Sequence, residues 1–288
     1  MEWTNRRIGH CVYCAGLGRA SEGALSNEHV VAFALAGKLV LEEATCSACA
    51  KATSAIEGHA MHEMFEAVRA SLRLPTRRPK RRRREFVLEG SDEATTKSVS
   101  LPADQFPATA SFLEFGEPAF FRGEAKRDGI LCEMARLVQL GGPRLDLAAK
   151  AHGMRKVEID HRSTPVTFAR MLGKIGYCYA AGMLGTDELE EALVLPALFD
   201  RPDEIGQWVG GRSLDSVSFD VTPRDHVLRL GIWQHDVVFV EMKLFAAAPT
   251  PGYVIVVGRW APGITRRLDA EFAPWPAVAS VMPISRGD

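Results

Sequence analysis

The chain has 288 residues, enough for one large or two ordinary domains, and its composition of 47% hydrophobic and 25% charged residues is typical of a globular protein. No apolar run reaches the length of about 18 residues that a membrane-spanning helix needs, and the start lacks the apolar stretch of a signal peptide. We therefore expect a cytoplasmic protein without membrane contact, in which thiols stay reduced and disulfides are not expected.

The net charge of −1 is unevenly distributed. Residues 1–85 contain 14 Lys or Arg against 9 Asp or Glu, and the remainder contains 21 against 27. Residues 69–84 alone contain nine basic residues and no acidic one. Asymmetry of this kind is typical of a protein that binds a polyanion at one end.

The first predicted feature is a metal-binding knuckle at Cys11 and Cys14, followed by a glycine-containing turn. Residues 25–41 form short apolar runs that are interrupted at Gly37-Lys38, which predicts two brief strands or a strand and a loop. A second Cys-x-x-Cys pair follows at Cys46 and Cys49.

A helix is predicted over residues 47–72, because apolar residues recur every four positions. Gly58 weakens this helix and Pro75 ends it. The apolar positions are Ala52, Ile56, Ala60, Met64, Val68 and Leu72.

The stretch that follows is too basic to pack into a core, so we expect a charged linker or an extended arm over residues 76–85. Beyond it we expect a strand at 85–88, a helix at 164–184 that begins at Thr164-Pro165, and strands at 227–233, 236–245 and 253–257. The predicted organisation is a module at 1–75, the linker, and an α+β accessory domain of unknown role at 86–288.

The two Cys-x-x-Cys pairs predict a structural Zn²⁺ site. Thiolates suit zinc, and two short pairs together supply the four ligands of a closed tetrahedral site. A zinc ribbon without any catalytic role has the same four ligands. The remaining cysteines, Cys132 and Cys178, are isolated and are expected to be buried as small hydrophobic residues.

The residues between the pairs resemble the HNH, or ββα-metal, endonucleases. The family pattern is Cys-x-x-Cys, then Asp/Glu-His-Ile/Val with Pro and a Leu-Gly-Gly-like turn, then Cys-x-x-Cys with Asn or His opening a helix. The matching segments, within residues 11 to about 70, are Cys11-Val-Tyr-Cys14, Glu28-His29-Val30-Val31, Leu35-Ala36-Gly37 and Cys46-Ser-Ala-Cys49. The resemblance implies a zinc-stapled ββα-metal fold for the module.

The resemblance also implies a metal-dependent endonuclease that hydrolyses DNA phosphodiester bonds. His29 would be the general base, and Glu28 would bind a catalytic Mg²⁺ or Mn²⁺. The chain departs from the pattern at Ala32, at Ala36 and most seriously at Ala50, where the family has a metal-binding Asn or His. Glu57, two helical turns after Ala50, is the leading substitute ligand, provided that the helix leans across the site.

Phosphate contacts by Lys and Arg supply affinity without sequence readout, so the basic residues are expected to bind DNA. A solvated surface, or a nuclear address in a eukaryotic source, is the plainer interpretation of the same run. The residues concerned are Arg69, Arg73, Arg77, Arg78, Lys80, Arg81, Arg82, Arg83 and Arg84.

Alternative interpretations remain open. The chain has the features of a catalytically inactive, zinc-stapled nucleic-acid-binding protein if no side chain replaces the ligand that is missing at Ala50. An alanine introduced on purpose at position 32 or 50 would have the same effect. Segments 168–175 and 251–258 are loosely similar to parts of bacterial HNH proteins of about this size, and the C-terminal domain is a candidate for a homodimer or protein-partner contact.

Overall fold

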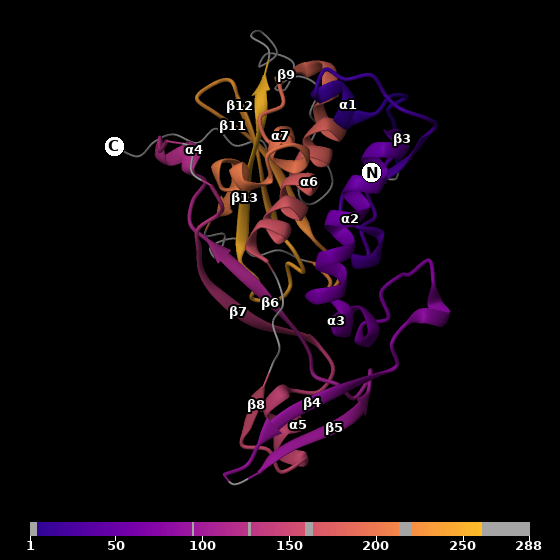
Figure 1. The fold of residues 1–288 in the computed structure, drawn as a ribbon, viewed down its shortest axis with the longest axis vertical. Helices are drawn as coiled ribbons and strands as arrows, with labels where there is room; N and C mark the ends of the chain where they lie inside the picture. The colour runs from indigo at the N-terminus through magenta and orange to yellow at the C-terminus, as the bar shows by residue number, and fades with distance from the viewer. Residues whose placement is uncertain (1–4, 94, 126–127, 159–163, 213–220, 261–288) are drawn as a thin grey trace.

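The structure is a computed structural model that describes residues 5–93, 95–125, 128–158, 164–212 and 221–260. Its fold is mixed α/β, with a large body and a smaller lobe that are joined by a long β-hairpin (Figure 1). None of the helices in these ranges combines the length and apolarity needed to cross a bilayer.

The N-terminal part is built on a three-stranded sheet in the order β1-β3-β2. β2 runs antiparallel to β3, with Glu28 opposite Leu41 and His29 opposite Val40, whereas β1 is parallel to β3. A strand at the start of the 25–41 segment and a helix after Cys46 agree with the sequence prediction. The second strand, β3, begins only at Val40, at the end of the segment for which a second strand or a loop was expected. The elements are β1 (Asn5–Arg7), α1 (Val12–Gly16), β2 (Leu25–His29), the 3₁₀ turn η1 (Phe33–Leu35), β3 (Val40–Cys46) and α2 (Ser47–Glu63).

The single helix predicted over 47–72 is wrong in its extent. α2 ends at Glu63, and a separate helix, α3 (Glu66–Ser71), follows after a change of direction at Phe65. Phe65 is fully buried, and its ring lies 5.7 Å from that of Phe112 and 6.0 Å from that of Phe245. The burial of this ring against distant elements outweighs the local helical periodicity.

The smaller lobe has its own core. β4 pairs with both β5 and β8, and α5 covers this sheet. Leu88, Leu101, Ala148, Ala149 and Met154 form the core of the lobe. The predicted strand at 85–88 is present and is longer than expected. The elements are β4 (Glu85–Ser91), β5 (Thr96–Pro102), α5 (Leu145–Ala151) and β8 (Lys156–Glu158).

A hairpin of two long strands, β6 (Ala108–Phe115) and β7 (Cys132–Gly141), joins the lobe to the large body (Figure 1). The short helix α4 (Ala119–Arg122) lies in the connection between its strands. Tyr253 on β13 donates a hydrogen bond to the Leu113 carbonyl on β6, which fixes the hairpin to the C-terminal sheet.

The large body is centred on the predicted helix at 164–184, which the structure contains as α6 (Pro165–Leu184). This helix contacts α2 on one side and the C-terminal sheet on the other (Figure 1). The predicted C-terminal strands are also present, in the sheet order β10-β13-β12-β11 with β9 beside β13. The elements are η3 (Thr186–Glu188), β9 (Leu189–Glu191), α7 (Leu195–Phe199), η4 (Pro202–Glu204), α8 (Ile205–Trp208), β10 (Val209–Gly211), β11 (Val227–Trp233), β12 (Val237–Lys243) and β13 (Gly252–Trp260).

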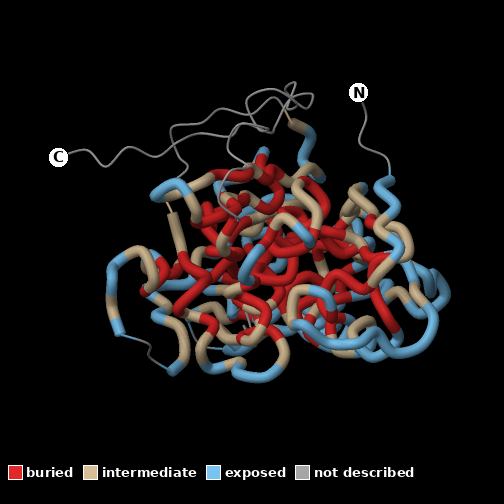
Figure 2. Tube along the Cα trace, turned by 90° about the horizontal axis from the view of Figure 1, so that it is seen from above, coloured by how far each residue is buried: buried red, intermediate tan, exposed pale blue. Residues whose placement is uncertain are grey.

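One hydrophobic core runs through the whole large body, from Cys11 to Trp260, and its buried segments cross the centre of the molecule (Figure 2). Gly176 allows α6 to approach β13 closely, because a Cβ atom at this position would lie 2.9 Å from the Ile255 side chain. The N-terminal module therefore packs on the accessory part through a continuous interior.

Candidate functional site

The four cysteines of the two Cys-x-x-Cys pairs converge. Their sulfur atoms all lie within 4.8 Å of one another, and among the described residues they are the one group of three or more metal-ligating side chains that comes together. Sγ of Cys14 lies 3.7 Å from that of Cys46 and 3.6 Å from that of Cys49. Zn–S bonds of about 2.3 Å in a tetrahedron place the sulfurs about 3.8 Å apart, so the cluster fits zinc.

Local structure explains this convergence. Cys11 and Cys14 lie at the start of α1, and Cys46 and Cys49 lie at the start of α2, where unpaired backbone N–H groups and the helix dipole favour negative charge. Burial alone raises the pKa of Cys46, but hydrogen bonds from the backbone of Cys49 and Glu22 lower the pKa to about 6. The backbone hydrogen bonds therefore favour the thiolate form of Cys46, the form that binds zinc, whereas burial raises the pKa of Cys14 and of Cys49.

A second polar cluster lies inside the module, around the ammonium group of Lys174. Nζ lies 2.7 Å from Oε1 of Glu28 on β2 and 2.7 Å from Oε1 of Glu57 on α2. It also donates hydrogen bonds to the backbone carbonyls of His29 and of Val30, the latter at 3.3 Å. The lysine is fully buried, and the Glu28 and Glu57 side chains are 8% and 18% exposed, so little water reaches this ion-pair cluster.

The electrostatics of the cluster favour a charged lysine. Burial alone lowers the pKa of Lys174, but the carboxylates of Glu28 and Glu57 outweigh it and raise the pKa well above the ordinary value. Burial raises the pKa of Glu57, and the neighbouring Lys174 charge opposes this effect. Two carboxylates and one ammonium leave the cluster with one uncompensated negative charge when all three are ionised.

His29 follows Glu28 on β2, and its imidazole is half-buried, with its ring 5.5 Å from that of Phe33. Burial lowers the pKa of His29, and the positive charges of Lys174 and Arg77 lower it further. The imidazole is therefore neutral at pH 7 and can accept a proton.

The structure brings Glu28 and Glu57 together at Lys174, and α2 leans toward β2 enough for Glu57 to reach the cluster. His29 joins the cluster through its backbone carbonyl, and its imidazole lies against Phe33. Ala50 contributes only a methyl group. Sequence reasoning missed Lys174, although a signal was present. The helix at 165–184 contains two charged residues, Arg170 and Lys174, and most of its other residues are apolar. Because a lysine is rarely fully buried without an ion-pair partner, a lysine in such a helix predicts a carboxylate beside it.

The predicted basic residues surround the end of this module. Arg69 and Arg82 are half-buried, whereas the other seven are exposed along the loop between α3 and β4 (Figure 1). The expected extended arm needs correction at Arg82 and Arg83. Arg82 donates a hydrogen bond to the Leu74 carbonyl, Arg83 pairs with Glu66 at 3.5 Å, and Pro79–Arg81 form the 3₁₀ turn η2. The Arg83–Glu66 pair holds the end of the loop against α3, and the Arg82–Leu74 hydrogen bond joins two parts of the loop.

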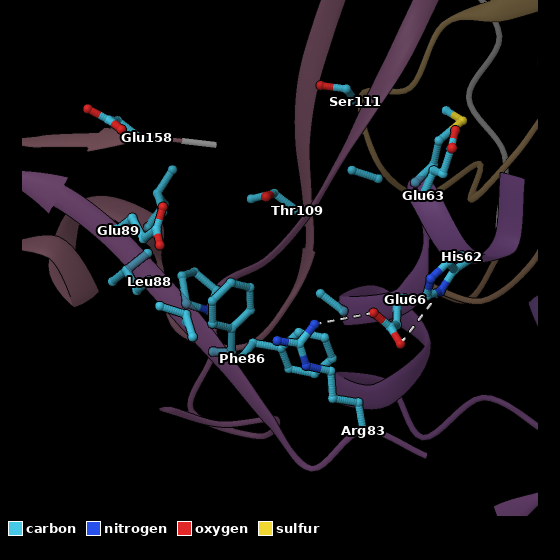
Figure 3. Close-up of a pocket in the computed structure, with 17 residues that line it drawn as sticks. His62, Glu63, Glu66, Arg83, Phe86, Leu88, Glu89, Thr109, Ser111 and Glu158 are labelled. Atoms are coloured by element: carbon cyan, nitrogen blue, oxygen red, sulfur yellow. Dashed lines mark ion pairs between the residues drawn. The ribbon is translucent and has the colours of Figure 1, made fainter. Parts of the chain in front are cut away.

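A cavity of about 390 Å³ lies elsewhere, between α2–α3 and the smaller lobe (Figure 3). Four carboxylates line it, from Glu63, Glu66, Glu89 and Glu158, beside the cationic Arg83. An acidic lining repels phosphate, so we do not place the nucleic-acid site there.

The two isolated cysteines differ from each other. Cys178 is buried as expected and accepts or donates a hydrogen bond with the Tyr13 hydroxyl at 3.0 Å. Cys132 is only half-buried, at the start of the exposed strand β7, so the expectation of full burial is wrong for this residue.

Comparison with known proteins gives no match to this chain, whether with protein-family models, with characterised proteins or with solved structures. The assignment of a function therefore depends on the chemistry of the site.

Proposed function

We propose that the protein is a nuclease of the HNH type that hydrolyses DNA phosphodiester bonds with His29 as general base. The observation that carries the proposal is the environment of the His29 imidazole. The ring is half-buried at the end of β2, and its pKa is lowered by burial and by the charges of Lys174 and Arg77. A neutral imidazole beside cationic groups can deprotonate a water molecule next to a phosphate.

The exposed loop supplies the phosphate contacts. Arg77 is close enough for its charge to lower the pKa of His29, and Arg78, Lys80 and Arg81 follow it on the surface. In the proposed reaction the water oxygen attacks phosphorus and its proton passes to His29. The bond from phosphorus to the leaving oxygen then breaks, a solvent water protonates that oxygen, and arginine side chains offset the charge on the phosphate oxygens.

The zinc site supports this proposal only as a structural staple. It closes the module by joining the start of α1 to the start of α2, and all four positions of a tetrahedral ion would be filled by sulfur. A closed site of this kind has no open position for water or phosphate.

Catalytic Mg²⁺ or Mn²⁺ does not fit the expected place. The carboxylates of Glu28 and Glu57 already contact the Lys174 ammonium, and Mg²⁺ needs about six oxygen ligands at 2.0–2.1 Å around its own centre. Our proposed steps therefore involve only side chains of this chain.

A second function is favoured by the same cluster together with Ala50: a zinc-stapled protein that binds nucleic acid without cutting it. In this case the buried carboxylates serve only to pair Lys174, and the exposed basic loop accounts for binding.

Plasmid cleavage distinguishes the two functions. The full chain and its variants His29→Gln and His62→Gln are incubated with supercoiled plasmid in Mg²⁺, in Mn²⁺ and without added divalent ion. His62 is the matched control, because it is an exposed histidine on the same module that pairs with Glu66 at 3.8 Å. We expect cutting by the wild type and His62→Gln and its loss in His29→Gln.

Binding of plasmid by all three proteins without cutting by any would support the second function. If none of the three retains DNA in a gel-shift assay, both functions are wrong.

A further inference from the structure

The ion-pair cluster has the oxygen ligands of a cation-binding site, and the cation that occupies it is the ammonium group of Lys174. Four oxygens surround Nζ of Lys174: the carboxylate oxygens of Glu28 and Glu57 and the carbonyl oxygens of His29 and Val30. Two carboxylates and two backbone carbonyls are ligands that a hard divalent ion would use. An ammonium group has three N–H donors, fewer than the four oxygens, and Oε1 of Glu57 is held at 2.7 Å as an ion pair without a hydrogen bond of good geometry.

The lysine is anchored in this position. It lies in the middle of the 20-residue helix α6, and the helix is buried on nearly all sides by α2 and the C-terminal sheet. Its side chain has no exposed surface. Removal of Nζ from the cluster would leave a buried ammonium without partners, which is strongly unfavourable.

Charge also argues against a divalent ion beside the lysine. A dication in contact with the same carboxylates would lie within a few ångströms of the ammonium, and like charges at such separations repel strongly in a poorly hydrated interior. Among the described residues, no third acidic or histidine side chain joins Glu28 and Glu57 in a metal-binding group.

We propose that Lys174 is the resident cation of the site formed by Glu28 and Glu57, and that its ammonium excludes divalent metal ions from this position. The accessory part of the chain thereby supplies the positive charge that the N-terminal module needs. Zinc binds at the thiolates, and the carboxylate site takes no metal. This inference concerns binding and holds whether or not the protein cuts DNA.

Manganese binding to the zinc-loaded full chain tests the proposal. Free Mn²⁺ is measured by electron paramagnetic resonance during titration of the wild type, Glu57→Gln, Lys174→Ala and the double variant Lys174→Ala/Glu57→Gln. Mn²⁺ prefers oxygen ligands and leaves a four-thiolate zinc site untouched. We expect identical weak surface binding for the wild type and Glu57→Gln, and about one additional site per chain in Lys174→Ala that the double variant lacks.

Two results would overturn the proposal. One is a manganese site in the wild type that Glu57→Gln removes, and the other is a folded Lys174→Ala that gains no site. Folding of that variant is checked by its zinc content and circular dichroism. If it does not fold, the comparison of the wild type with Glu57→Gln still tests whether the carboxylate site takes a metal ion, because a manganese site that Glu57→Gln removes would overturn the proposal without the lysine variant or nuclease activity.

Discussion

Nζ of Lys174 lies 2.7 Å from a carboxylate oxygen of Glu57, and this contact joins α6 to α2 inside the core. A second contact of the same length joins Nζ to Glu28 on β2. Helix, helix and strand therefore meet at one buried charge, and the stability of the module depends on a residue outside it.

We expect Lys174→Met to destabilise the protein by about 3–5 kcal/mol, because two buried carboxylates would lose their cation. The free energy of unfolding, from urea denaturation followed by circular dichroism, measures the effect. Lys38→Met is the matched control. Lys38 pairs with Asp225 at 3.2 Å, but its side chain is 78% exposed, so a loss of at most about 1 kcal/mol is expected. An equal loss in both variants would contradict the buried ion-pair cluster.

Cys46→Ser is expected to remove zinc and to unfold the N-terminal module, because structural zinc contributes directly to folding free energy. Zinc content by mass spectrometry and the far-ultraviolet circular dichroism spectrum report the two effects. Cys132→Ser is the control, since this half-buried thiol lies outside the cluster and should leave the zinc content unchanged. Full zinc content in Cys46→Ser would contradict the site.

Replacement of Arg77, Arg78, Lys80 and Arg81 by Gln is expected to weaken DNA binding about equally for all sequences. Each lost phosphate contact should reduce the slope of log affinity against log salt by about 0.9. Fluorescence anisotropy at several salt concentrations measures this slope. The double variant Arg144→Gln/Lys150→Gln removes exposed charges from the distant lobe and serves as control. A slope unaffected by the first set of changes would exclude the loop from the interface.

His226 should make stability depend on pH. Its Nε2 donates to the Leu35 carbonyl at 2.8 Å and its Nδ1 accepts from the Phe245 N–H at 3.0 Å, so a proton on Nδ1 has no acceptor. Burial is the main cause of the lowered pKa of His226. Above the ordinary histidine pKa of about 6.5, both folded and unfolded chains hold the ring neutral. Below it, the unfolded chain takes up the proton more readily than the folded chain, and the free energy of unfolding falls.

The measurement is urea denaturation at pH 7.5 and 5.5 for the wild type, His226→Gln and the exposed-residue control His62→Gln. The fall between the two pH values should be about 1 kcal/mol smaller in His226→Gln than in the other two proteins. The same fall in all three would show that His226 does not contribute to the pH dependence.

Local patterns predicted much of the fold. The α6 helix has a Thr-Pro start and strong apolar periodicity, and the C-terminal strands are rich in β-branched residues, so both were predictable from sequence. The break at Phe65 was not, because its cause is the burial of one ring against Phe112 and Phe245, which are distant in sequence. The strands β6 and β7 were missed for a similar reason, since long-range pairing stabilises them.

The candidate site also has a part that was predictable from the sequence and a part that was not. The thiolate cluster follows from two short motifs, and the approach of Glu57 to Glu28 was a geometric possibility on an amphipathic helix. The cation between them came from a helix more than a hundred residues later, and no local pattern connects that helix to the module.

The single buried ammonium also limits how the module can be used outside this chain. In a fragment that ends before α6, Glu28 and Glu57 would have no ammonium group to neutralise them. The fragment would have to take up protons or a metal ion, or else admit water. If the module were transplanted into another protein, Glu28 and Glu57 would bind cations that Lys174 excludes in the native chain.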